Sequence, residues 1–139
     1  MSEIHVPLIP LGAFNILWSY ANGRLNGGDN AQSFLIVMPP DGVFLRTLRV
    51  KGYLGASASL FIELFRTPKD DFGGLPSVDP IANQTIASPP RRIFDESIAL
   101  SASGKNVVDN AIYNYTVAVV AHTTGPTDQA FIGEVALFY

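Results

Sequence analysis

The chain has 139 residues, of which 47% are hydrophobic and 15% charged, and nine basic and twelve acidic residues give it a net charge of −3. This length suits one domain with its own core. There is no cysteine, which excludes a disulfide framework and a thiolate metal site, and the charge gives no electrostatic basis for nucleic-acid binding.

The N-terminal segment, residues 1–12, is expected to be an extended arm or a short edge strand. Pro7 and Pro10 lack the backbone N–H that a sheet ladder requires, which confines the segment to a sheet edge or to the surface of a neighbour. The segment has no basic region, so we expect no signal peptide. No stretch reaches the roughly twenty apolar residues of a membrane-spanning helix.

With the N-terminal segment included, the chain predicts about eight to ten β-strands and no helix. The glycine- and asparagine-rich stretch 21–32 is expected to be a loop. Leu45 lies out of phase with the residues that follow it, which predicts a β-bulge near Thr47. Apolar residues on both faces of 33–38 indicate a central strand or one covered by a neighbour. The expected strands are 13–20, 33–38, 43–54 (the longest), 60–66, 93–101, 112–121 and 131–139.

The last two strands alternate with a period of two, which places Val117 and Val119 on one face of the first strand. By the same count, Phe131, Val135 and Leu137 share a face of the second. A short loop rich in threonine, glycine and proline joins these strands and predicts that they pair antiparallel.

The strand 60–66 places its aliphatic residues inward and Phe61 and Phe65 outward, beside Glu63. Two outward phenylalanines need cover from a loop or from another chain. Residues 67–92 contain half of the ten prolines and form a long proline-rich loop, expected to pack over the sheet or onto a neighbour. The interface hypothesis therefore contains Phe61, Phe65, Phe72, Pro7 and Pro10.

These features predict a single all-β domain, residues 1–139, built as an antiparallel β-sandwich. A jelly roll is the first choice and an immunoglobulin-like sandwich the second. The charged fraction is below the usual value of roughly a quarter. Either other subunits cover part of the surface, or neutral polar residues line the outer faces.

The sequence carries no recognisable catalytic motif. His5 and His122 are the candidate general bases, but no GxSxG nucleophile motif accompanies them,. A calcium site built from Asp70, Asp71 and Asp79 is conceivable, although solvated loop acids are the favoured interpretation. We therefore expect no enzyme, no cofactor and no bound metal, and a small hydrolase is the weakest hypothesis.

Exposed aromatic residues suggest a second function. Trp18 and Tyr53 are the glycan contacts of an alternative hypothesis, a lectin-like module in which aromatic rings stack on sugars. Strand-borne tyrosine and tryptophan residues more often belong to a core or an interface.

Two patterns resemble small jelly-roll domains of bacteriophage particles, which occur as head decorations, spikes, fibres and tail-associated modules. The first is V-D-N-x-x-Y-x-Y-x-V-x-V followed by G-E-V-A-L-F-Y within residues 106–139. The second is L-R-V-K-G followed by L-F-I-E-L-F-R within residues 48–66, which resembles their central hairpin. The resemblance implies a virion structural component made in the cytoplasm. It would form a homo-oligomer, with a trimer favoured, and contact other particle proteins and, in some cases, host-surface glycans.

Overall fold

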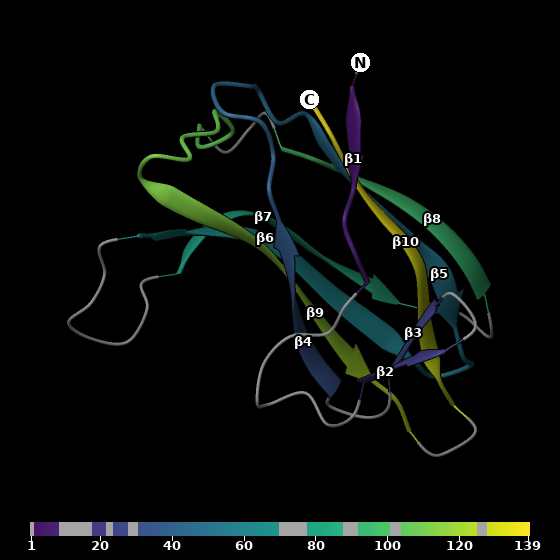
Figure 1. Cartoon of the computed structure of the whole chain (residues 1–139). Helices are drawn as coiled ribbons and strands as arrows, with labels where there is room; N and C mark the ends of the chain where they lie inside the picture. The colour runs from purple at the N-terminus through teal and green to yellow at the C-terminus, as the bar shows by residue number, and fades with distance from the viewer. Residues whose placement is uncertain are drawn as a thin grey trace.

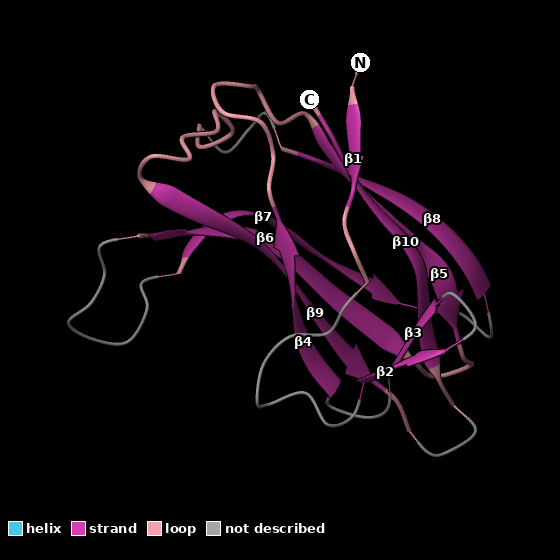
Figure 2. Ribbon diagram, in the orientation of Figure 1, coloured by secondary structure: helices cyan, strands magenta, loops and turns pink. Residues whose placement is uncertain are grey.

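The computed structural model is an all-β sandwich of two antiparallel sheets (Figures 1 and 2). None of the described residues is helical. The structure describes residues 2–8, 18–21, 24–27, 31–69, 78–87, 92–100, 104–124 and 128–139, with the side chains of 18–21, 24–27 and 31 left out.

The described residues form ten strands, divided between a six-stranded and a four-stranded sheet. The six-stranded sheet has the order β2-β3-β10-β5-β8, with β1 also paired to β10, and the four-stranded sheet has the order β4-β9-β6-β7. The first contains β1 (Glu3–His5), β2 (Trp18–Ala21), β3 (Arg24–Gly27), β5 (Thr47–Leu54), β8 (Arg92–Ala99) and β10 (Ala130–Phe138). The second contains β4 (Ala31–Val37), β6 (Ser59–Pro68), β7 (Asp79–Ala87) and β9 (Tyr113–His122).

The strands β3 to β10 pair in a nested order. The innermost pair is β6 with β7, and β5 with β8 follows outward. The next pair is β4 with β9, and β3 with β10 is the outermost. Successive pairs alternate between the two sheets, so the chain is one long antiparallel hairpin folded across the sandwich.

The core lies between the two sheets and is formed by alternate residues of the longer strands. In β5 and β6 the buried residues recur with the expected period of two,. Each fully buried aliphatic side chain stabilises the fold by roughly 1.5–3 kcal/mol relative to an exposed one. Fully buried residues include Leu48, Val50 and Leu54 of β5, Leu60, Ile62 and Leu64 of β6, Val117 and Val119 of β9, and Ile132 and Leu137 of β10.

A β-bulge interrupts β10 at Gly133. Ile132 pairs with Gly52 and Glu134 pairs with Lys51, so Gly133 is an extra residue opposite β5,. Because of this bulge, Ile132 rather than Phe131 points into the core, which corrects the face predicted for Phe131.

The β-bulge predicted near Thr47 is wrong, because the irregular pairing of β5 lies opposite Gly133 of β10. Pairing of β5 with β8 is regular from Thr47 to Leu54. Leu45 is buried but precedes the strand, and its backbone N–H donates to the carbonyl of Asn106. The strand is therefore shorter than predicted, and β6 and β9 are the longest described strands, at ten residues each.

The predicted pairing of the last two strands is wrong. The strand β9 pairs with β4 and β6, whereas β10 pairs with β1, β3 and β5 in the opposite sheet. The loop between them crosses from one sheet to the other. The central hairpin expected within residues 48–66 is also wrong, because its two strands, β5 and β6, lie in different sheets.

Two segments expected to be loops contain strands. The proline-rich range 67–92 contains β7, and the glycine- and asparagine-rich range 21–32 contains β3. Pro80 is tolerated because β7 is an edge strand, and a register shift beside Phe65 accommodates it,. In the arm, Glu3–His5 form β1 at the edge of β10, as the edge-strand alternative predicted.

An ion cluster fixes the start of β7 to the rest of the four-stranded sheet. Asp79 accepts a hydrogen bond from Arg66 Nε at 2.7 Å and pairs through its other oxygen with Lys105. The Arg66 guanidinium lies 4.1 Å from the centroid of the Tyr113 ring,. The hydrogen bonds from Lys105 and then Arg66 lower the pKa of the Asp79 carboxyl.

We expect Asp79→Asn to lower the free energy of unfolding by about 1 kcal/mol at neutral pH, since the cluster is partly solvated. A carboxyl with a lowered folded pKa contributes stability above its ordinary pKa of 3.8, and this contribution is lost as the pH falls through the folded value. Urea unfolding should therefore show a difference between wild type and variant that closes under acid conditions. A difference that persists unchanged in acid would contradict the ionic origin.

Candidate interaction surface

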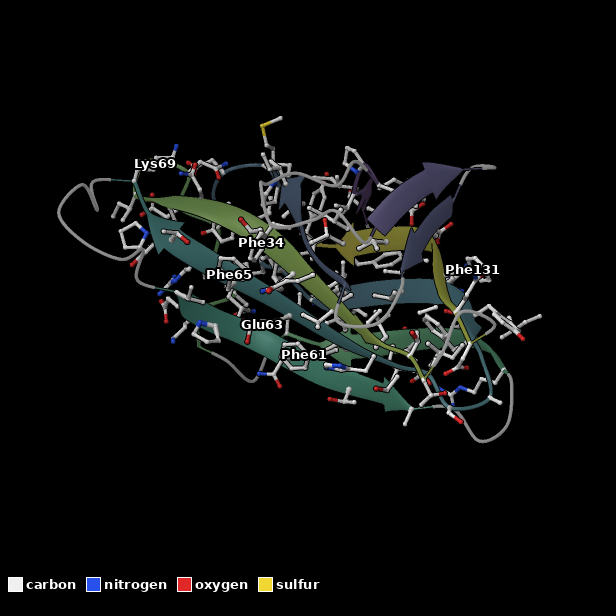
Figure 3. The ribbon with its side chains drawn as sticks, turned by 90° about the horizontal axis from the view of Figure 1, so that it is seen from below. Phe34, Phe61, Glu63, Phe65, Lys69 and Phe131 are labelled. Carbon is white, nitrogen blue, oxygen red and sulfur yellow. The ribbon has the colours of Figure 1, made fainter. Side chains whose placement is uncertain are left out.

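The outward face of the four-stranded sheet, here called the outer face, has an apolar centre. In register, Phe34 lies beside Ala118 and Ala118 beside Glu63, while Thr116 lies between Ile36 and Phe65. Residues paired in this way share one face of a sheet. The centre of the outer face is formed by Phe34 and Ile36 of β4, Thr116, Ala118 and Val120 of β9, and Phe61, Glu63 and Phe65 of β6. Polar residues flank it, Gln32 on β4 and Asn83 and Thr85 on β7. Figure 3 labels Phe34, Phe61, Glu63 and Phe65.

Two phenylalanines meet across the middle of this face. The rings of Phe34 and Phe65 are 6.2 Å apart between centroids and nearly perpendicular, at 87°. This edge-to-face arrangement favours the pair beyond its buried area. Phe65 is outward by register, as predicted, but Phe34 covers it so that only 8% of it is exposed. Its cover thus comes from the same sheet, whereas a loop or another chain was expected.

Ala118 is also buried, whereas the other members of the outer face are more accessible. Phe61 is half-buried, and Ile36 is 52% exposed. Glu63 is the single charged residue among the described members of the face, and Asn83 of β7 approaches its carboxylate at 3.5 Å. A half-exposed row of apolar side chains with so little charge is typical of the centre of a protein interface.

A cavity of about 560 Å³ hollows the outer face at the end where β4 ends and β9 begins. Ile36 and Met38 form its apolar wall, and Met38 is 82% exposed. Asn114 and Thr116 add polar groups. Its other lining residues include Val37, Lys69, Asn110, Tyr113 and Tyr115.

Among the described residues that line the cavity, Lys69 is the only charged one. Its ammonium group donates to the backbone carbonyl of Asn110, and its backbone N–H donates to the carbonyl of Ile112 at 2.8 Å. Asn110 is itself held, because its backbone N–H donates to the Asp41 carboxylate and its side chain to the carbonyl of Pro39. These bonds fix a positive charge at one end of the outer face.

The opposite sheet carries a second, smaller aromatic group. Tyr53 lies between Phe131 and Ile93 in register, and the Tyr53 and Phe131 rings are 5.9 Å apart. Ile93 is 86% exposed. Beyond this row the face becomes charged, where Arg49 makes two hydrogen bonds to Asp95 and thereby lowers the pKa of that carboxyl.

The other predicted site residues do not gather at one place. Pro7 is exposed beyond β1, whereas Pro10 and Phe72 lie outside the described residues. The backbone of Trp18 is in register with Gly27, and through it with Ala130 and Leu54. Trp18 therefore belongs to the row next to that of Tyr53, not to the same row.

The described residues contain no cluster of acids and histidines that could hold a metal ion. Asp70 and Asp71, two members of the conceivable calcium site, lie outside the described residues, and Asp79 pairs with Arg66 and Lys105. His5 is in the six-stranded sheet and His122 ends β9 in the other. No described helix is long and apolar enough to cross a membrane.

The sequence missed Phe34 and Lys69 as members of the surface. The apolar run 33–38 held a signal for Phe34, because a strand with two apolar faces needs cover on both. The central alternative is wrong, since β4 is the last described strand on its side of the sheet. No pattern in the sequence distinguished Lys69 from the other lysines.

A comparison with protein-family models, with curated proteins and with solved structures finds no match for this chain.

Proposed function

We propose that this protein is a non-enzymatic structural subunit of a phage-like virion or particle, such as a decoration, spike or tail-associated protein, and that it acts by homo-oligomeric assembly. The observation that carries the proposal is the outer face. Phe34, Phe61 and Ile36 lie there with one charged neighbour, Glu63, and an open cavity at one end.

The nested pairing of β3 to β10 supports a jelly-roll assignment within this proposal. In a jelly roll, eight antiparallel strands form two sheets through two Greek keys, and the fold is used in viral capsid and lectin domains. An immunoglobulin-like sandwich divides seven strands into sheets of four and three, with a different order. The four nested pairs, alternating between sheets, favour the first topology.

The composition supports assembly as well. Only 15% of the residues are charged, and interface centres are depleted in charge and enriched in aromatic residues. Exposed apolar residues gathered on one face indicate an interaction site, in contrast to single scattered ones. Assembly would bury the side chains of Phe61, Ile36 and Met38, which are partly or largely exposed in the isolated chain.

We expect Phe61→Asp to abolish or strongly weaken self-association while the sandwich stays folded. The substitution places a charge among apolar side chains that association would bury, and a buried unpaired charge is strongly unfavourable. Light scattering after size-exclusion chromatography measures the mass, and circular dichroism checks the β-fold.

Ile93→Asp is the matched control, because Ile93 is 86% exposed on the opposite sheet. The control should keep the wild-type mass. Equal masses for Phe61→Asp and wild type would show that Phe61 and the outer face are not part of the interface. A lower mass for the Ile93→Asp control would show that the interface lies on the other sheet.

A second candidate function, glycan binding, is favoured by the row of Phe131, Tyr53 and Ile93. Their side chains form an accessible aromatic and aliphatic strip beside the charged part of the six-stranded sheet. Aromatic rings on a lectin-like sandwich offer stacking surfaces to sugars. A glycan array with the wild-type chain tests this candidate, and absence of binding at high protein concentration would count against it.

A further inference from the structure

We propose that the cavity beside Lys69, here called the Lys69 cavity, binds a small amphiphilic carboxylate. The carboxylate group would contact the Lys69 ammonium, and the apolar body would lie against Ile36 and Met38. The volume of about 560 Å³ lies within the range of roughly 300–1,000 Å³ that is typical of small-molecule sites. All of these residues belong to one chain, so the inference goes beyond the proposed assembly and does not rest on it.

The pairing of β4, β9 and β6 places the apolar wall and the charge on opposite sides of the Lys69 cavity. Ile36 of β4 lies beside Thr116 of β9 in register. On the other side of β9, the backbone N–H of Lys69 donates to the carbonyl of Ile112 and continues the ladder from β6. Figure 3 shows Lys69 at this end of the sheet. Neighbouring strands are about 4.8 Å apart, so the two sides are separated by about 10 Å across β9. A ligand with its charge at one end and its apolar body at the other suits this spacing.

The Lys69 ammonium has hydrogen-bonding capacity left for an anion. It carries three N–H donors, one of which goes to the carbonyl of Asn110. None of the ion pairs between described residues includes Lys69. Two carboxylates, Asp41 and Asp109, instead accept backbone N–H groups of the turn that precedes β9, and neither lines the Lys69 cavity. The amide of Asn114, which does line it, offers a further donor to a carboxylate.

The β4 side of the Lys69 cavity suits an apolar group. Ile36 and Met38 are 52% and 82% exposed, whereas Val37 and Tyr115, which also line the cavity, are buried. The flexible thioether of methionine adapts to different shapes and packs favourably against aromatic rings. A carboxylate without an apolar body would leave this wall open to water, and an apolar molecule without a charge would leave the ammonium unpaired. An amphiphilic carboxylate uses both sides.

Titration of the full chain with 3-phenylpropionate, followed by the NMR chemical shifts of backbone amides, tests the proposal. We expect saturable shifts that centre on Met38, Asn114 and Thr116. The neutral amide 3-phenylpropanamide has the same apolar body without the charge and should bind at least about tenfold more weakly. Acetate has the charge without the body and should give no saturable shifts at the same concentrations. Equal affinities for the acid and the amide, or saturable shifts that centre on the opposite sheet, would overturn the proposal.

Substitutions on the two sides of the Lys69 cavity separate their contributions. Lys69→Met removes the charge and should raise the dissociation constant of 3-phenylpropionate at least about tenfold, whereas Lys69→Arg keeps the charge and should bind nearly as wild type does. Met38→Glu places an acid in the apolar wall and should abolish binding, and Met38 is exposed enough for the fold to persist. Lys51→Met is the matched control, because Lys51 pairs with Glu134 on the opposite sheet. An unchanged dissociation constant for Lys69→Met or for Met38→Glu would refute the site.

The same titration with Phe61→Asp keeps ligand binding apart from self-association. Phe61 does not line the Lys69 cavity, and this substitution is expected to hold the chains apart. Binding by Phe61→Asp that is equal to or tighter than binding by wild type would support the site, and a tighter value would show that assembly covers the cavity. Absence of binding by both chains would overturn the ligand site and leave the mass measurements, and with them the proposed function, unaffected.

Discussion

Gly52→Ala should destabilise the sandwich by about 3 kcal/mol or more, a value at the high end for added atoms in a packed core. A Cβ at this position would lie 2.8 Å from Cζ of Phe94 and far inside contact distance of the Phe131 backbone oxygen. Gly52 is flanked by β10 and β8, so its backbone cannot retreat from both. Thermal unfolding should show a loss of roughly 10 °C in Tm.

Gly133→Ala is the control for this substitution. Gly133 is the extra residue of the bulge opposite β5, and a Cβ there meets only the carbonyl oxygen of Lys51, at 3.9 Å. We expect a change below about 1 kcal/mol. Similar Tm values for the two variants would contradict the close approach of β10 to Gly52.

Ile62→Ala should lower the free energy of unfolding by about 2–5 kcal/mol, the range for truncating a buried aliphatic side chain. Ile62 is completely buried between the two sheets, in the middle of β6. Its removal leaves a cavity among side chains of both sheets, which relax only partly around it. Urea unfolding monitored by circular dichroism measures the difference.

The matched control is Ile93→Ala, since Ile93 is 86% exposed on β8. The same atoms are removed, but they contact mainly solvent, so the change should be below about 1 kcal/mol. Equal losses at the two positions would show that the assigned inner and outer faces are wrong.

The all-β class and most strand faces could be predicted because a period of two survives wherever a strand is regular. Val117 and Val119 of β9, and the aliphatic residues of β6, are buried as predicted. The face predicted for Phe131 is wrong because Gly133 adds a residue to β10 and reverses the alternation of faces before it. A single glycine within an apolar run is not enough to predict such a bulge from the sequence.

The pairing of strands could not be predicted from the loops. The composition of residues 122–130 favours a turn, but it does not show whether the chain turns within a sheet or crosses the sandwich. Likewise, the prolines of residues 67–92 predicted a loop, but proline is compatible with an edge strand. The edge strand β7 was therefore missed within this range. These features depend on contacts between segments distant in sequence.

The interaction surface could be predicted in part. Phe61 and Glu63 lie on the outer face as their alternation indicated. Phe34 and Lys69 join them only through pairing of β4, β9 and β6 and through the turn that holds Lys69 against Asn110. Whether an outward phenylalanine is covered depends on its cross-strand neighbours, as the contact between Phe65 and Phe34 demonstrates.

The solution mass of the wild-type chain, measured by light scattering over a range of concentrations, tests most directly whether the outer face is an assembly surface. We expect a mass that is a multiple of 15.0 kDa and falls towards the single-chain value on dilution. A mass of 15.0 kDa at every concentration would contradict the account, because the apolar outer face would then remain open to solvent.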